Sequence, residues 1–350
     1  MGNDSKLKIL NIISGSKFGG AELFFERLAL SFEKKKNIQQ KLIIKSDQRR
    51  FNFLEKYVKD IEQIKFFKRY NFLLPYHLEN IIHKFNPDIV LTWMNRASIM
   101  LPNSKIMNEI TIGRLGGYYK IKNYVKCDYL ITNTLDLRDY VIAKGWDNKQ
   151  VEFIPNFVSK NSNLKKILNF EKSKILLCMG RFHENKAIDI LIKAMPFLTS
   201  FSLVIVGEGA LKKSYEELIH KFDLSDRVKI FGWSDDISEF INSSDILVCP
   251  SRHEPFGNVV VEGWAHKIPV IVSDIGGPGR IVKHKSNGMK FEKDNVFDLV
   301  KKVKDLDFDS NLRKKIVRNG FEFFKVNYSE EVVVTKYIKF FERIKKSCVV

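Results

Sequence analysis

Short apolar runs alternate with longer amphipathic segments along most of this chain. Alternation of strands and helices favours a parallel sheet covered by helices on both faces, and it predicts the α/β fold class. Helical periodicity is clear in 21–34 and 137–144. The runs expected to form strands are 8–13, 41–44, 89–92, 129–132 and 151–154 in the first half, and 174–179, 202–206, 228–231, 245–249 and 269–273 in the second.

The chain length predicts two domains, because 350 residues exceed what one ordinary core supports. The alternation pauses over residues 158–173, a polar, lysine-rich stretch that we interpret as a linker. We therefore expect one doubly wound domain over residues 1–160 and a second over 161–330. Helical periodicity in 330–346 predicts that residues 331–350 form a last helix, which packs back across the domain junction.

The net charge of +18 calls for an anionic partner, and nucleic acid, anionic lipid and anionic metabolites all qualify. Residues 33–70 hold twelve Lys or Arg against five Asp or Glu, interleaved with aromatic residues. Such a segment suits an anionic membrane surface, although a solvated lysine-rich face explains it equally well. We expect no nucleic-acid partner, because the chain has no RNP, KH or zinc-knuckle motif.

The sequence contains no apolar stretch long enough to span a membrane and no signal-peptide pattern at its start. Its four cysteines have no CxxC spacing, which favours free thiols and a cytoplasmic location. The histidines lack the HxxxH spacing, and Asp305, Asp307 and Asp309 fit a solvated turn better than a cation site. We expect neither a metal nor a cofactor.

The segment from Glu254 to Glu262 is the most informative stretch for function. It follows a predicted strand and leads into a predicted helix over 259–265. The N–H groups of Phe256, Gly257 and Asn258 should lie at that helix N-terminus, where they can bind an anion. Carboxylates that accept hydroxyl hydrogens beside amides that hold phosphate suit a nucleotide-sugar. The alternative is a simple capping arrangement.

Two other strand ends carry candidate phosphate ligands. Gly19 and Gly20 follow the first strand and open a helix, so the backbone could approach a phosphate, or form an ordinary turn. Arg181 and Lys186 follow the first strand of the second half, at the edge where α/β sheets bind ligands. They suit a diphosphate, although two solvated cations would look the same.

Two segments of the first half are candidates for an acceptor site. Arg96 lies in one, and Arg114 and Tyr118 lie in the other, within 113–120. We expect these side chains to form a cationic, aromatic rim at the strand ends that would suit an anionic or sugar acceptor. A packed loop with incidental charges is the alternative.

Four motifs in order resemble those of retaining glycosyltransferases with the GT-B fold, in glycosyltransferase family 4. GT-B enzymes have two Rossmann-like domains that face a central cleft. The motifs are 18–22 (FGGAE), 180–186 (GRFHENK), 206–209 (VGEG), and the Glu254/Glu262 pair followed by 275–277 (IGG). Two departures are Arg280, where the family often has a glutamate, and the absence of a histidine in 113–117.

The resemblance implies a role for each matched residue. Gly19 and Gly20 would approach the donor diphosphate, and Arg181 and Lys186 would neutralise it. Glu254 would bind donor sugar hydroxyls near the amides of residues 256–258, and Glu262 would bind the ribose. Gly207 and its neighbours would border the base, and no metal would be needed. The first domain would bind the acceptor and the second the donor.

The expected function is transfer of a sugar, with retention, from a nucleotide-diphosphate sugar to a glycan or lipid-linked acceptor. Family frequency favours a UDP-sugar. A basic protein without a membrane span suits synthesis of lipopolysaccharide or another surface polysaccharide at the inner face of the cytoplasmic membrane. The alternatives are a GT-B nucleotide-sugar epimerase, or a non-enzymatic protein that binds nucleic acid or an anionic surface.

Overall fold

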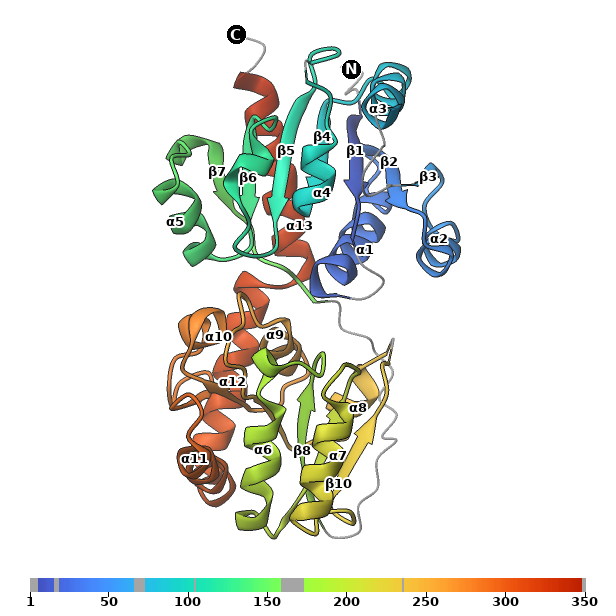
Figure 1. Cartoon of the computed structure of the whole chain (residues 1–350). Coiled ribbons are helices and arrows are strands. Elements are labelled where there is room, and N and C mark those ends of the chain that lie inside the picture. Colours follow the sequence, from blue (N-terminus) through green and yellow to red (C-terminus); the bar gives the residue numbers. More distant parts are fainter. Residues whose placement is uncertain are drawn as a thin grey trace. The chain divides into compact units, whose positions relative to one another are not determined.

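The computed structural model describes residues 6–15, 19–65, 73–103, 105–158, 173–234 and 236–347 (Figure 1). The chain forms two compact units, and each is treated by itself below. Unit 1 comprises residues 1–157 together with 330–350, and unit 2 comprises residues 158–329. The boundaries expected from the sequence, after residues 160 and 330, lie within three residues of those in the structure. Apart from its two end residues, the expected linker over 158–173 lies outside the described residues, as do Phe18 of the glycine motif and residues 66–70 of the basic segment.

Over its described residues, unit 1 contains a seven-stranded parallel sheet with the order β3-β2-β1-β4-β5-β6-β7. The strands are β1 (Leu7–Ile13), β2 (Ile38–Lys45), β3 (Ile61–Ile64), β4 (Ile89–Trp93), β5 (Ile110–Leu115), β6 (Tyr129–Thr132) and β7 (Val151–Phe153). The α-helices are α1 (Gly20–Glu33), α2 (Gln48–Leu54), α3 (Leu73–Phe85), α4 (Met94–Ile99), α5 (Leu135–Ala143) and α13 (Glu330–Ser347).

Helices cover both faces of this sheet, which explains why its strands are continuous apolar runs. β1 is an example, because six of its seven residues are buried and its side chains alternate between the two cores. One core packs β1, β4 and β5 against α1 and α13. The other packs the opposite face against α3, α4 and α5.

Unit 2 contains, in the part of it that is described, a six-stranded parallel sheet with the order β10-β9-β8-β11-β12-β13. The strands are β8 (Lys174–Met179), β9 (Phe201–Val206), β10 (Val228–Phe231), β11 (Ile246–Cys249), β12 (Val270–Ser273) and β13 (Met289–Phe291). The α-helices are α6 (Ile188–Ala194), α7 (Lys212–Lys221), α8 (Ser238–Asn242), α9 (Asn258–Ala265), α10 (Gly276–Ile281), α11 (Val296–Phe308) and α12 (Ser310–Asn327).

The prediction of two doubly wound α/β domains is confirmed. The bounds of β6, β8 and β10 are those expected, and β1, β2, β4, β7, β9, β11 and β12 differ by a few residues at most. β3, β5 and β13 were not predicted. β5 was missed because Gly113 and Arg114 within it resemble the start of a loop, and β13 because it has three residues.

The C-terminal helix α13 was expected to pack across the domain junction, and the structure packs it in the core of unit 1. Residues on one stripe of the helix are buried there at spacings of three and four. They are Val333, Val334, Tyr337, Phe340, Phe341 and Ile344. The helix therefore completes the fold of the N-terminal domain, although 172 residues of unit 2 separate it from that domain in sequence.

Candidate functional site

Lys186 and Glu254 meet at the carboxyl ends of β8 and β11, two adjacent strands of unit 2. Lys186 ends the short 3-10 turn that follows β8, and Glu254 lies in the loop that follows β11. The ammonium and carboxylate form an ion pair with side chains 27% and 13% exposed. Burial disfavours the charged ammonium, but the Glu254 carboxylate outweighs this effect and raises the pKa of Lys186. The Lys186 side chain is therefore a charged ammonium at neutral pH.

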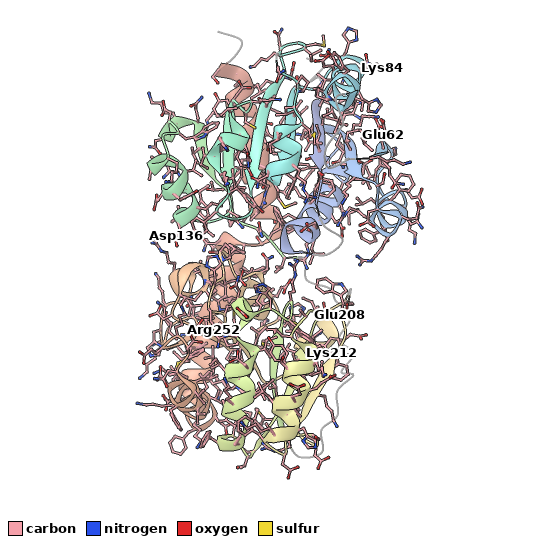
Figure 2. All side chains as sticks on the ribbon, in the orientation of Figure 1. Glu62, Lys84, Asp136, Glu208, Lys212 and Arg252 are labelled. Carbon is pink, nitrogen blue, oxygen red and sulfur yellow. The ribbon has the colours of Figure 1, made fainter. Side chains whose placement is uncertain are left out.

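The two loops that carry this pair are held together by further bonds. The backbone N–H groups of Arg252 and His253 both donate to the Asn185 carbonyl, over 2.8 and 3.2 Å. The Arg252 guanidinium binds both carboxylate oxygens of Asp189 at 2.9 and 3.0 Å, and its Nε donates to Asp294 at 2.6 Å. Figure 2 labels Arg252 in unit 2. Sequence reasoning missed these residues, because their spacing in the chain does not reveal that they meet.

Gly207 and Gly209 let the loop after β9 lie directly against the loop after β8. Gly180 N–H donates to the Val206 carbonyl and Phe182 N–H donates to the Glu208 carbonyl, over 3.0 and 2.8 Å. A Cβ at Gly207 would overlap the Gly180 carbonyl oxygen, and its φ of +149° lies in the region that favours glycine. Gly207 therefore shapes the loop that carries Arg181, whose side chain is exposed.

The helix α9 begins at Asn258, one residue before the start expected from the sequence. Gly257 is the N-cap residue, with φ of +90°. Phe256 is buried against the Tyr328 ring, and Glu262 is buried in the second turn of α9. Phe256, Gly257 and Asn258 thus border the N-terminus of α9, whereas the Glu254 side chain contacts Lys186.

The first turn of α10 also holds the Glu254 loop. Gly277 N–H donates to the Glu254 carbonyl over 3.0 Å, and a Cβ at Gly277 would overlap the Pro255 carbonyl. Close packing against the backbone of Glu254 and Pro255 therefore explains why glycine occupies positions 276 and 277. Arg280 is exposed on α10, three residues farther along.

The glycine turn of unit 1 contains an acid that sequence reasoning did not assign. α1 begins at Gly20 with Gly19 as N-cap, and the buried Glu22 carboxylate lies where a Cβ of Gly19 would be. Its side chain also lies close to Gly15. Since an acid in the first turn of a helix already interacts with its N-terminus, the turn is less favourable to a diphosphate than the glycine pair alone suggests. The position of Glu22, within the first turn of the predicted helix, was the sequence signal that could have revealed this interaction.

Arg114 does not belong to an exposed rim, contrary to expectation. It lies within β5 and is 1% exposed. Its Nε donates to the Tyr337 hydroxyl at 2.8 Å, and another guanidinium nitrogen donates to Asn156. The guanidinium also lies over the rings of Phe24 and Trp93, with Cζ 4.5 and 4.6 Å from the ring centroids. Arg114 is therefore a core residue that joins β5 to α13 and to the segment after β7.

The other two acceptor candidates are exposed in unit 1. Arg96 lies on α4, and Tyr118 lies after β5 with its ring edge-on to Tyr140, 5.2 Å between centroids. The structure does not bring Arg114 to the surface beside either of them. The cationic aromatic rim thus loses its central residue.

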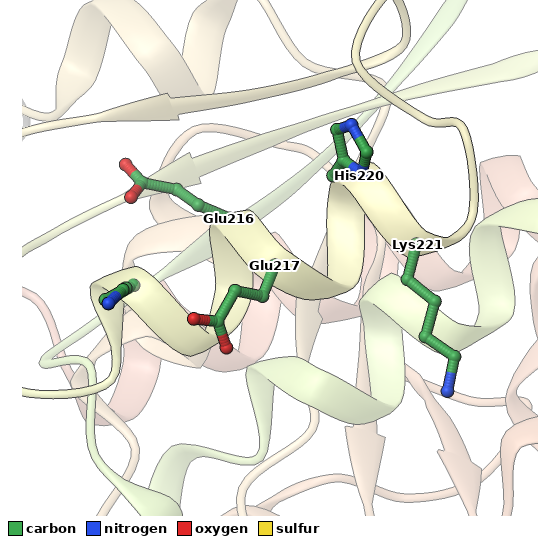
Figure 3. Close-up of a pocket in the computed structure, with 5 residues that line it drawn as sticks. Glu216, Glu217, His220 and Lys221 are labelled. Carbon is green, nitrogen blue, oxygen red and sulfur yellow. The ribbon is translucent and has the colours of Figure 1, made fainter.

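Two surface hollows lie away from these loops. One, of about 400 Å³, is lined by residues of α7 alone, namely Lys213, Glu216, Glu217, His220 and Lys221 (Figure 3). The other, of about 650 Å³, lies on unit 1 beside the edge strand β7 and the end of α13. Neither includes a residue of the Lys186–Glu254 loops.

Among the described residues, no cluster of three or more His, Cys, Asp or Glu side chains is placed to hold a metal ion. In the same part of the chain, no helix has the length and hydrophobicity required to cross a bilayer.

Comparison with known proteins adds independent evidence. Residues 159–323 match the family model described as Glycosyl transferases group 1. The lipopolysaccharide core biosynthesis glycosyltransferase LpsD of Rhizobium meliloti (strain 1021) is 28% identical over 345 residues, covering 96% of this chain and 98% of that protein. LpsE of the same organism, with the same description, is 27% identical over 340 residues, covering 92% and 96%.

The fold also matches a solved structure over nearly the whole chain. The crystal structure of Anabaena HepE in complex with UDP and glucose has a TM-score of 0.82 to this chain, at 18% identity, covering 96% of this chain and 99% of that one. The chain is a glycosyltransferase of the GT-B fold. In this glycosyltransferase the segment matched by the family model contains Lys186, Glu254 and the loops that hold them.

Proposed function

We propose that this glycosyltransferase moves a sugar from a UDP-sugar to a lipid-linked glycan, with retention at the anomeric carbon, in the synthesis of a lipopolysaccharide core. The ion pair of Lys186 and Glu254 on loops fixed by other contacts carries this proposal. The names of LpsD and LpsE support the acceptor class, and the UDP and glucose bound by HepE support the donor class.

The proposed chemistry divides the work between an ammonium and a carboxylate. The bond from the anomeric carbon to the diphosphate oxygen breaks, and a bond to the acceptor hydroxyl oxygen forms on the same face. Lys186, together with Arg181 of the same segment after β8, stabilises the negative charge that grows on the diphosphate, which accepts the acceptor's proton. Glu254 accepts hydrogen bonds from the donor sugar hydroxyls.

The remaining donor contacts in the proposal follow the resemblance. The amides of Phe256, Gly257 and Asn258 lie at the α9 N-terminus, near the Glu254 loop. Glu262 would bind the ribose hydroxyls and Gly207 would border the base. Gly19 and Gly20 of unit 1 would approach the diphosphate, in competition with Glu22. No metal is required in this scheme, since side chains and backbone amides balance the charge.

The test is mutation of the pair. Lys186→Ala and Glu254→Gln should each reduce the release of UDP from UDP-glucose by roughly 10²- to 10³-fold, the loss typical of one transition-state donor. Lys212→Ala is the matched control, because Lys212 is an exposed lysine of the same unit. Thermal unfolding checks that the variants fold.

Full UDP release by both folded variants would show that this site assignment is wrong. If the wild type instead converts the donor alone into an epimer of the nucleotide-sugar, the epimerase alternative holds.

We also propose that the protein contacts an anionic membrane surface through the region around α2. Arg49, Lys56 and Lys59 are exposed there, beside the rings of Phe53 and Tyr57. These two rings pack edge-on with 5.7 Å between centroids and remain 40% and 57% exposed. Exposed aromatics among cations suit the interface of an anionic bilayer, where a lipid-linked acceptor would lie.

A further inference from the structure

Arg252 contacts three separate elements of unit 2 with one side chain. Its guanidinium binds both carboxylate oxygens of Asp189 on α6, at 2.9 and 3.0 Å. Its Nε donates to Asp294 at 2.6 Å, in the loop between β13 and α11. Its Nη1 also donates to the Glu184 carbonyl at 3.1 Å. Because the N–H groups of a guanidinium form a rigid fork, bonds in three directions fix the place of this side chain.

The position of Arg252 in the chain gives these bonds a consequence for the ion pair. Arg252 lies two residues before Glu254. Glu184, whose carbonyl it binds, begins the 3-10 turn that ends at Lys186. The Arg252 backbone N–H donates to the Asn185 carbonyl of the same turn at 2.8 Å. The backbone and the side chain of one residue therefore hold the turn of Lys186 against the loop of Glu254.

The charges around Arg252 favour this arrangement in a region that is only partly buried. The side chains of Arg252, Asp189 and Asp294 are 30%, 20% and 41% exposed. Burial raises the pKa of the Asp189 carboxyl, but hydrogen bonds from Arg252 and Lys193 outweigh burial and lower that pKa below its usual value. Asp189 is therefore a carboxylate at neutral pH. A planar guanidinium that binds a carboxylate through two parallel bonds has a defined orientation, which an ammonium lacks.

Lys193 offers a comparison within the same network. Its ammonium also binds Asp189, at 3.0 Å, but both residues lie on α6, four positions apart. This pair joins two turns of one helix, whereas the Arg252 pair joins α6 to the loop of Glu254. Loss of the Lys193 side chain thus removes a charge from the neighbourhood of Asp189 and leaves the bonds of Arg252 in place.

We propose that Arg252 is a positioning residue for sugar transfer, which holds Lys186 and Glu254 in the alignment that the reaction requires. The inference rests on the proposed roles of Lys186 and Glu254, and it adds a residue that needs no contact with the donor. A displacement of about 1 Å at a catalytic group can cost about 10²-fold in rate. Release of the turn and the loop from each other should therefore slow the reaction more than it weakens donor binding.

Steady-state kinetics of UDP release from UDP-glucose separate positioning from binding. Arg252→Ala should lower kcat by about 10- to 100-fold with a much smaller change in KM, because it removes alignment and no donor contact. Lys193→Ala is the matched control and should keep the wild-type kcat. Arg252→Lys keeps the charge without the fork, so it is the second variant if thermal unfolding shows that Arg252→Ala does not fold, and it should also lower kcat.

A double-mutant cycle identifies the group through which Arg252 acts. If Arg252 aligns Lys186, the factor by which Arg252→Ala lowers kcat should be several-fold smaller when Lys186 is already alanine, since the group to be aligned is then absent. A general structural role of Arg252 would instead lower kcat by the same factor in both backgrounds.

A chemical measurement tests the alignment of Lys186 without the donor. The uncharged amine of a lysine reacts with N-hydroxysuccinimidyl acetate, and the Glu254 carboxylate keeps Lys186 in the ammonium form. Arg252→Ala should therefore raise the acetylation rate of Lys186 by about fivefold at neutral pH, the factor expected when one partly exposed ion pair is lost. Peptide mass spectrometry measures this rate, and Lys193→Ala should leave it unchanged.

An unchanged kcat in Arg252→Ala, or an unchanged acetylation rate of Lys186, would overturn the inference, as would equal losses of kcat in the two backgrounds. The proposed donor chemistry fails separately, if Lys186→Ala releases UDP as fast as the wild type. The acetylation rates would still show in that case whether Arg252 positions Lys186.

Discussion

Gly207 shows how a single residue controls the donor loops of this glycosyltransferase. Its backbone adopts φ of +149°, and the Gly180 carbonyl occupies the space of the missing Cβ. The loop after β8 can therefore hydrogen-bond to the loop after β9, which fixes the start of the Arg181 segment. The contribution of Gly207 to a donor site is thus indirect, through the geometry of the neighbouring loop.

Replacement of Gly207 by alanine should destabilise the protein for two reasons. The positive φ costs about 1–3 kcal/mol for a residue with a side chain, and the clash with a backbone oxygen adds a packing cost of about 1–3 kcal/mol. Gly145→Ala is the control, because Gly145 has φ of +99° but no atom near its Cβ position. Urea unfolding should show the larger loss of free energy in Gly207→Ala, and equal losses would contradict the steric argument.

At the scale of one element, α13 completes a core that is built mainly by the first 157 residues. Phe341 is fully buried and packs against Phe32 and Tyr337, with ring centroids 6.2 and 5.8 Å apart. Tyr337 also accepts the hydrogen bond from Arg114. One stripe of α13 therefore supplies both apolar contacts and the partner of a buried cation.

Phe341→Ala should lower the free energy of unfolding of unit 1 by about 3–5 kcal/mol, because it removes a buried ring and leaves a cavity. Phe308→Ala is the control, since Phe308 is 95% exposed at the end of α11 and its loss should change stability by less than about 0.5 kcal/mol. Calorimetric unfolding of both variants gives the comparison. If Phe341→Ala unfolds like the control, α13 does not contribute to the core of unit 1.

At the scale of the whole molecule, the net charge of +18 is the dominant property. Part of the basic segment is neutralised by the fold, because Arg50 pairs with Glu26 and Lys41 pairs with Asp60. Other cations of that segment, such as Arg49 and Lys56, are exposed. Exposed cations such as these can contact an anionic surface directly. The long-range attraction to that surface depends on the net charge of the whole protein.

The protein should co-sediment with vesicles that contain phosphatidylglycerol, and the bound fraction should fall as salt is raised from about 0.05 to 0.5 M, since salt screens charges over about 10 Å at 0.1 M. Vesicles of phosphatidylcholine alone are the control. Phe53→Ala combined with Tyr57→Ala should weaken the binding, because both rings are exposed among the cations. Binding that is equal for both vesicle types would argue for a soluble acceptor.

The sequence by itself determined the α/β class, the two-domain organisation and most strands. A strand of a sheet that is covered on both faces must be a continuous apolar run, and such a run can be recognised without knowing which strands are neighbours. It also indicated Lys186 and Glu254 as candidates, through glycine turns and charges placed just after such runs. β5 shows the limit of this reasoning, because one glycine and one arginine disguised a fully buried strand.

Only the tertiary structure decided which of these residues meet. The ion pair of Lys186 and Glu254 joins positions 68 residues apart, and Arg114 reaches Tyr337 across 223 residues. It also decided that Arg114 is buried and that α13 belongs to unit 1. The physical reason is that periodicity reports how one element is buried, whereas pairing across elements depends on strand order. That order places the ends of β8 and β11 side by side in unit 2.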